Sequence, residues 1–123
     1  MSGSRKRLAA LFIAASSTIA ILAPGLASTF VGWRVTGIAA DDVLMVRAYP
    51  GATSRILVGY PDGVTLSMTG RCTGDINLGD IQTQPAWKQR QTVGDKWCEL
   101  WFDPYGNGEF RNGWVFGRYI RPA

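Results

Sequence analysis

The residues best suited to chemistry in this chain are two cysteines, Cys72 and Cys98, and a few carboxylates. The chain contains no histidine. This excludes Ser–His–Asp and Cys–His catalysis and most zinc hydrolase designs, because each of these uses imidazole as a base or a metal ligand. We therefore expect a protein that is not an enzyme and that holds no metal and no cofactor.

The two cysteines are predicted to form a disulfide with each other. An even number of cysteines in an exported chain is typical of disulfide pairing. The alternatives are a zinc site, which wants four ligands and finds no histidine here, and a reactive thiol pair, which would close in an oxidising compartment. Closing a loop of about 27 residues should contribute roughly 3–4 kcal/mol to stability.

Strand periodicity supports this pairing. Residues 64–69 alternate between apolar and polar types, and continuing that parity places Cys72 on the apolar face. In residues 97–102, Cys98 shares parity with Leu100 and Phe102. Both sulfurs are thus expected to face the core of neighbouring strands, unless a bulge at Gly70 breaks the first parity.

Acidic residues give no catalytic pattern. The pairs Asp41–Asp42 and Asp75 with Asp80 lack a context that would separate two carboxyl pKa values, as a glycosidase requires, so we interpret them as solvated loop acids. Residues 103–114 match an EF-hand calcium loop at positions 1, 5 and 6, but not at positions 3 and 12. A hairpin loop is therefore expected over residues 103–113.

The aromatic residues are more informative. Trp97 and Trp101 share the strand face opposite Leu100, about 13 Å apart along an ideal strand. Exposed aromatic faces stack on sugars and pack against peptides, which makes a glycan or peptide groove one interpretation. The other is that these side chains cover the edges of a small core or pack beneath inserted segments.

The N-terminal segment has the three-part layout of a secretory signal peptide. Basic residues 5–7 precede an apolar run at 8–23, Pro24–Gly25 ends any helix, and Gly25 and Ala27 provide the small residues of a cleavage site. We expect a signal peptide at 1–27 and a periplasmic or secreted bacterial protein that meets the membrane only during export. The alternative is a retained anchor, although 16 helical residues span only about 24 Å.

The positive charge belongs mostly to that segment. The chain has a net charge of +4, but past residue 7 ten Lys/Arg face nine Asp/Glu. The remaining domain has no basic run of the kind that marks a nucleic-acid patch, so no nucleic-acid partner is expected.

Short strand signals separated by turn residues indicate a small all-β domain. A longer insertion at 73–96 contains polar helix formers and is expected to be partly helical. The predicted strands are residues 34–38, 43–48, 56–60, 64–69, 99–102, 113–116 and 119–121.

Four sequence blocks resemble, in order, the motifs of bacterial SH3-like domains: Leu44–Gly51, Pro61–Leu66, Trp97–Leu100 and Asn112–Val115, the last closing on Tyr119–Ile120. The resemblance implies an SH3-like, five-stranded, partly open barrel over residues 34–122. It also places Tyr49 and Tyr119 at groove-lining positions. Met45 departs from the family's usual asparagine, and the 73–96 and 103–112 segments are longer than usual.

We therefore expect an exported, non-catalytic binding module that contacts cell-wall peptidoglycan or an envelope protein. Its candidate ligand-binding residues are Tyr49, Trp97, Trp101 and Tyr119. The alternative is a structural or assembly component of an envelope complex that docks on a partner protein through exposed aromatic residues.

Overall fold

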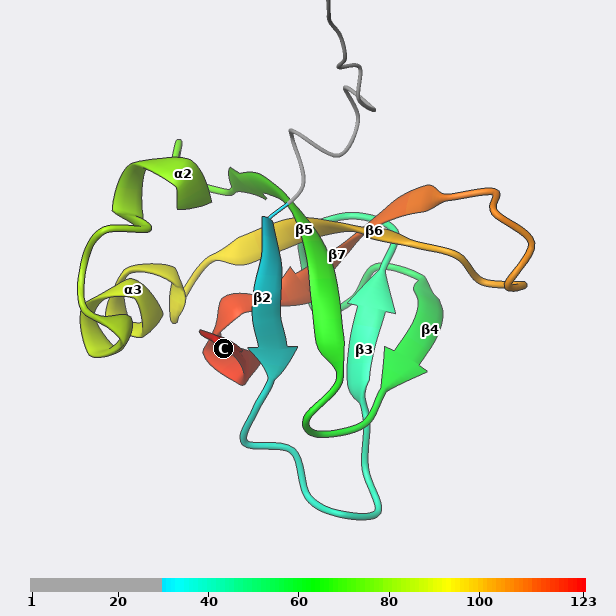
Figure 1. Ribbon diagram of the computed structural model, residues 1–123. Coiled ribbons are helices and arrows are strands. Elements are labelled where there is room, and N and C mark those ends of the chain that lie inside the picture. Colours follow the sequence, from blue (N-terminus) through cyan, green and yellow to red (C-terminus); the bar gives the residue numbers. More distant parts are fainter. Residues whose placement is uncertain (1–29) are drawn as a thin grey trace, which may run out of the picture.

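In the computed structural model, which describes residues 30–123, seven strands form one antiparallel sheet with two short helices at its side (Figure 1). The predicted signal peptide at 1–27 lies outside the described residues. The elements in chain order are β2 (Phe30–Val35), β3 (Leu44–Arg47), β4 (Ile56–Tyr60), β5 (Thr65–Cys72), α2 (Leu78–Ile81), α3 (Ala86–Val93), β6 (Trp97–Phe102), β7 (Arg111–Phe116), the 3-10 helix η2 (Gly117–Tyr119) and β8 (Ile120–Pro122).

The strands are ordered β4-β3-β7-β6-β5-β2-β8, and every neighbouring pair is antiparallel. The prediction of a small all-β domain is confirmed. The sheet is open, with β4 and β8 at its edges, and it has seven strands instead of the five that the resemblance implies. The number differs because β2 pairs with β5 on one side and with the short β8 on the other, which extends the sheet.

Two strand boundaries differ from the prediction. The first strand covers Phe30–Val35 and not residues 34–38, because the chain leaves the sheet at Thr36 and turns at Gly37, whose φ is +71°. Near the end of the chain, Tyr119 belongs to η2, and the last strand begins only at Ile120. The other predicted strands lie within a few residues of the observed ones.

The core lies on one face of the sheet and follows the alternation expected from the sequence. In β6, Cys98, Leu100 and Phe102 are buried, whereas the residues between them are half-buried. In β5 the same alternation places Leu66, Met68 and Cys72 in the core. Further core residues are Val35, Val46, Val93, Val115 and Ile120.

The predicted disulfide joins Cys72 and Cys98, which lie directly opposite each other on β5 and β6. An irregularity does occur near Gly70, whose φ is +103°. Between the Met68–Leu100 pair and the Cys72–Cys98 pair, β5 advances by four residues and β6 by two. An excess of two residues preserves side-chain parity, so Cys72 still faces the core.

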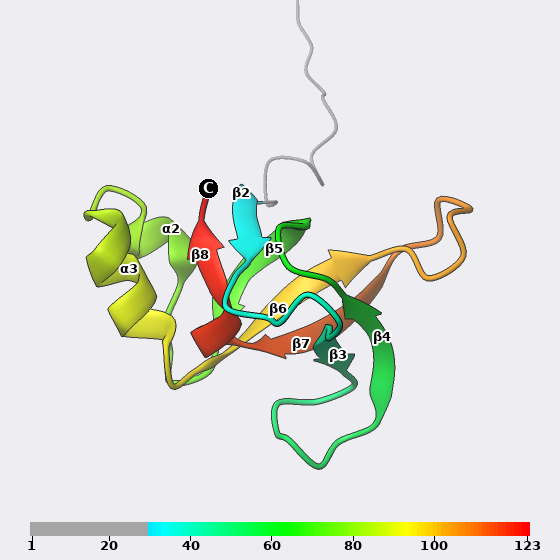
Figure 2. The same cartoon turned by 90° about the horizontal axis from the view of Figure 1, so that it is seen from below.

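The insertion at 73–96 forms the two helices, which confirms its partly helical character. Helix α3 packs against β8 and η2, and α2 packs against β5 (Figure 2). The buried side-chain amide of Gln89 on α3 donates hydrogen bonds to the carbonyl oxygens of Gln82 and Gln84, which follow α2. The insertion thus covers the β8 edge of the sheet and contributes Leu78, Ile81 and Val93 to the core.

Candidate functional site

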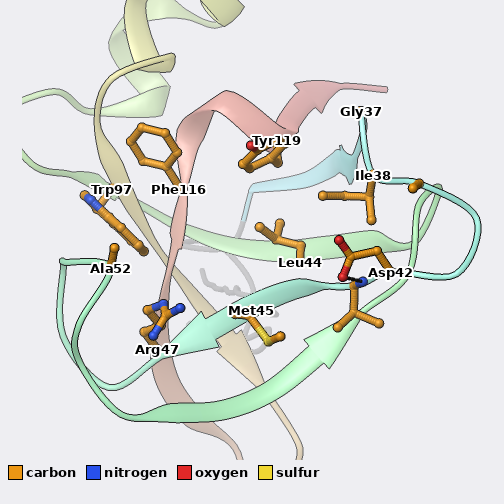
Figure 3. A pocket seen from close by; sticks show the side chains of 12 residues that line it. Gly37, Ile38, Asp42, Leu44, Met45, Arg47, Ala52, Trp97, Phe116 and Tyr119 are labelled. Carbon is orange, nitrogen blue, oxygen red and sulfur yellow. Dashed lines mark hydrogen bonds between the residues drawn. The ribbon is translucent and has the colours of Figure 1, made fainter.

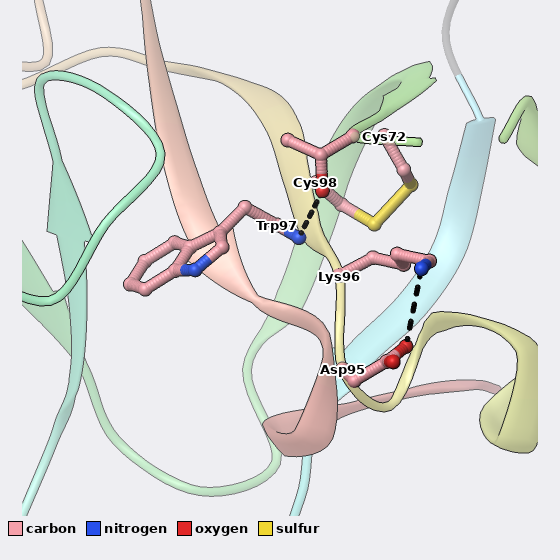
Figure 4. A network of polar contacts seen from close by, with 6 residues as sticks. Cys72, Asp95, Lys96, Trp97 and Cys98 are labelled. Atoms are coloured by element: carbon pink, nitrogen blue, oxygen red, sulfur yellow. Dashed lines mark hydrogen bonds and ion pairs between the residues drawn. A yellow bond between two sulfur atoms is a disulfide. The ribbon is translucent and has the colours of Figure 1, made fainter. Parts of the chain in front are cut away.

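Trp97 is held at the point where the insertion returns to the sheet. Its backbone N–H donates to Thr73 Oγ1 at 3.0 Å, and the Thr73 N–H donates to the Trp97 carbonyl oxygen at 2.8 Å. The disulfide lies immediately beyond, at the neighbouring residues Cys72 and Cys98 (Figure 4). Both ends of the insertion are therefore fastened beside this tryptophan.

An aromatic wall extends from Trp97 across the end of β7. Phe116 lies directly opposite Trp97 in the β6–β7 register, and their ring centroids are 5.3 Å apart. Tyr119, in η2, follows with its ring 6.2 Å from that of Phe116 in an edge-to-face arrangement. Aromatic pairs at these separations stabilise each other beyond the area that they bury, so the wall is a fixed feature.

This wall forms one side of a groove of about 570 Å³ (Figure 3). The loop between β2 and β3 provides Ile38 and Asp42 on the other side, and β3 provides Met45 and Arg47. The groove is thus mainly apolar, with one carboxylate and one guanidinium among its lining groups. Its size falls in the range of small-molecule and peptide sites.

The two charged groups are positioned by backbone hydrogen bonds. Asp42 Oδ1 accepts from the N–H of Val43 at 2.7 Å. Arg47 Nη1 donates to the carbonyl oxygen of Ser54 at 2.8 Å, which ties this side chain to the loop between β3 and β4. Each group keeps further hydrogen-bonding capacity, since a carboxylate has about four acceptor sites and a guanidinium five donors.

The four predicted ligand-binding residues do not lie together. Trp97 and Tyr119 share the groove. Tyr49 is 71% exposed and lies in the loop after β3, where it lines a second hollow. At this hollow the Arg71 guanidinium stacks over the Trp114 ring.

Trp101 lines neither hollow, although it is on the same face of β6 as Trp97. It lies beside Tyr60 and Phe110 near the far end of the strand. It is half-buried, as is Trp97, and no residue of the 73–96 insertion lines the groove beside Trp97 or the hollow beside Trp101.

Phe116, Met45 and Arg47 were missing from the predicted set. Phe116 could have been found from the hairpin register. The pair next to the loop is Phe102–Arg111, and counting five residues further along each strand leads to the pair Trp97–Phe116. No sequence pattern indicates that the β2–β3 loop folds over this end of the hairpin. Its contribution to the groove depends on the order of strands in the sheet.

The predicted hairpin loop forms over residues 103–110 and ends earlier than the predicted residue 113, because β7 begins at Arg111. One carboxylate organises this loop. Asp103 accepts backbone hydrogen bonds from Gly108, at 2.7 Å, and from Asn107 and Tyr105. These bonds, that from Gly108 foremost, lower the pKa of the Asp103 carboxyl. Because its oxygens accept from the loop's own backbone, this carboxylate serves as the centre of a turn.

The other titratable groups of residues 30–123 lie apart from this loop or at the surface. Burial, followed by the nearby Asp103 charge, raises the pKa of the Tyr60 phenol. Asp41, Asp42, Asp75 and Asp80 are all exposed. Within residues 30–123, no three cysteine or carboxylate side chains gather as a metal site would require.

In comparisons with known proteins, no family model matches the chain, and no curated protein or solved structure is significantly similar to it. None of the helices described here is long and apolar enough to cross a membrane. The disulfide indicates a non-reducing, extracytoplasmic environment, because such bonds persist where thiols are not kept reduced.

Proposed function

We propose that this protein is an exported, non-catalytic SH3-like binding module, and that the groove along Trp97, Phe116 and Tyr119 is its recognition site. The observation that carries the proposal is this aromatic wall, which the β6–β7 pairing and η2 hold in a fixed arrangement. The four sequence blocks that resemble bacterial SH3-like domains support the same assignment, since Trp97 lies in the third block and the fourth closes on Tyr119.

The ligand we propose is a segment of cell-wall peptidoglycan or of an envelope protein. The groove offers an apolar aromatic surface between a carboxylate, Asp42, and a guanidinium, Arg47. Such a surface suits an extended chain that has apolar groups together with charges of both signs. Aromatic residues and arginine are also the residue types that contribute most to binding at interfaces.

We further propose that the protein is periplasmic or secreted, after removal of a signal peptide at 1–27. The disulfide supports export from the cytoplasm. The measurement is the intact mass of the protein recovered from cells. We expect a mass that begins at Ser28 and is two hydrogens lighter than the reduced chain, whereas an intact Met1 would indicate a retained anchor.

Co-sedimentation with purified peptidoglycan tests the recognition site. Trp97→Ala removes one member of the aromatic wall and should abolish most of the sedimented fraction. Trp101→Ala is the matched control, because Trp101 lies on the same face of the same strand but outside the groove. The control should sediment as the unaltered protein does.

One outcome would count against the groove as the recognition site, and a second would decide between the two proposed ligands. Equal losses in the Trp97 and Trp101 variants would show that the groove is not the recognition site. Clean failure of the unaltered protein to sediment, with a protein partner recovered by crosslinking at the groove, would replace the cell wall with an envelope protein.

A second candidate function is a structural or assembly role through exposed aromatic residues. The β6–β7 hairpin extends away from the body of the domain (Figure 2), and its loop exposes Tyr105 and Phe110 by 74% and 60%. A photo-crosslinker placed at position 105 in cells would capture a partner protein under this proposal. A crosslinker at position 52, in the groove, would capture it under the first one.

A further inference from the structure

Charge is divided unevenly over the domain. Residues 84–96 and 117–123, which contain α3, η2 and β8, carry five Lys/Arg and one Asp. Residues 30–83 and 97–116 carry five Lys/Arg and eight Asp/Glu. The net charge near zero of residues 30–123 therefore conceals a basic end, where α3 packs against η2 and β8.

A shallow pocket of about 360 Å³ opens at this basic end, between α3 and η2. Trp87, Arg90 and Gln91 line it from α3, and Arg118 lines it from η2. No acidic residue contributes to the lining. The pocket lies on surfaces that do not form the aromatic groove, since the two share no lining residue.

Trp87, Arg90 and Arg118, which line the pocket, lie outside the buried core. Gln89 and Val93 are the buried residues of α3, whereas Trp87 is 66% exposed. The one ion pair within residues 30–123 joins Lys96 to Asp95, so neither Arg90 nor Arg118 has a carboxylate partner in that part of the chain. Large exposed aromatic residues beside arginines are typical of binding surfaces.

Each of these groups has a definite binding chemistry. A guanidinium binds a carboxylate or a phosphate through two parallel hydrogen bonds. The exposed indole offers a flat apolar face on which a ring can stack. The pocket has the volume of a site for a small molecule.

We propose that the α3–η2 pocket binds a sugar ring that carries an anionic group, either a carboxylate or a phosphate. Arg90 and Arg118 hold the anion, and Trp87 stacks on the ring. This site is independent of the aromatic groove and of the function proposed for it. Binding to it weakens with rising salt concentration, because its attraction is electrostatic and solvent-exposed.

The test is a titration of the isotope-labelled, purified full chain, followed by NMR at the Trp87 indole N–H. The probes are glucuronate, glucose 6-phosphate, glucose and inorganic phosphate. We expect the Trp87 signal to shift and saturate with the two charged sugars, and to shift far less with glucose or with phosphate alone. Comparison of glucuronate with glucose 6-phosphate decides which anion the site prefers.

Variants assign the roles. The double variant Arg90→Gln/Arg118→Gln should weaken binding of the charged sugars by about tenfold or more, because it removes charge-assisted hydrogen bonds. Trp87→Ala should weaken the binding of the charged sugars and leave the small response to inorganic phosphate unchanged. Because this variant lacks the indole, its binding is followed at the backbone amide of Gln91. Arg55→Gln is the control, because Arg55 is exposed and lies outside every lining of this pocket.

Three results would overturn the proposal. The first is the absence of any saturable shift with either charged sugar. The second is equal binding of glucose and glucose 6-phosphate. The third is that inorganic phosphate and glucose 6-phosphate bind equally well and that Trp87→Ala weakens neither. This result would show an adventitious ion only. All variants are surface changes, and their near-unaltered spectra elsewhere would show that the fold is kept.

Discussion

At its Trp97 end, the β6–β7 hairpin meets a disulfide, two hydrogen bonds to Thr73 and the packed aromatic wall, whereas at its Phe102 end it continues into the exposed loop at 103–110. Both ends carry a tryptophan on the same strand face. Only Trp97 lines the aromatic groove, because only there do the β2–β3 loop and η2 approach the strand. Strand parity determines which face of the sheet a side chain occupies. The loops and helices at the ends of the strand determine which residues lie beside that side chain.

Removal of the disulfide is the largest test of this difference. Cys72→Ala/Cys98→Ala should lower the free energy of unfolding by about 3–4 kcal/mol, because the unfolded chain regains the freedom of a loop that spans 26 positions. Denaturant unfolding measures the loss. Amide hydrogen exchange should quicken most around Trp97 and least in the 103–110 loop, and a uniform increase would contradict the idea of one fastened end.

Gly117→Ala should destabilise the Trp97 end of the hairpin through a steric clash. A Cβ at Gly117 would clash with the carbonyl oxygen of Val93, so α3 or η2 must shift, at a cost of about 1–3 kcal/mol. The matched control is Gly94→Ala, whose Cβ would meet its nearest atom, the Arg90 carbonyl oxygen, at 3.2 Å.

Thermal unfolding of both glycine variants decides the point. We expect Gly117→Ala to lower the melting temperature by several degrees more than Gly94→Ala. Because Gly117 lies between Phe116 and Tyr119, its variant should also disturb the aromatic wall. Similar melting temperatures would mean that the approach of α3 to η2 is looser than the structure describes.

The smallest effect is expected at the free end of the hairpin. The loop hydrogen bonds lower the folded-state pKa of Asp103, so their stabilisation is present above the ordinary carboxyl pKa of about 3.9 and is lost as the pH falls through the lowered folded value. NMR should show the Gly108 amide losing its hydrogen-bonded shift at acid pH while the Trp97 amide is unchanged. Asp103→Asn should remove most of this pH dependence.

Much of the fold follows from local sequence patterns. Alternation in residues 64–69 and 97–102 predicts which side chains are buried, and turn residues place the strand boundaries within a few positions. The disulfide follows from the two cysteines of an exported chain, and the same parity supports it. The five-strand number was wrong because it came from the resemblance, whereas the seven separate strand signals agree with the sheet.

The candidate site was less predictable. Of the four predicted ligand-binding residues, Trp97 and Tyr119 line the groove, whereas Tyr49 and Trp101 lie at other parts of the surface. The groove forms where the β2–β3 loop meets η2, elements that are far apart in sequence. The periodicity of a single strand does not show that two distant elements are in contact. Phe116 could therefore be found only from the β6–β7 register, and Met45 and Arg47 only from the order of strands in the sheet.

The two-residue excess in β5 near Gly70 restricts how this chain can change in length. Deletion or insertion of one residue there would rotate Cys72 to the solvent side, leaving two thiols that cannot meet and are open to exchange with other molecules. Deletion of two residues keeps the bond and straightens the strand. Length variants at this site should therefore alternate between the intramolecular disulfide and mixed disulfides as residues are removed one at a time.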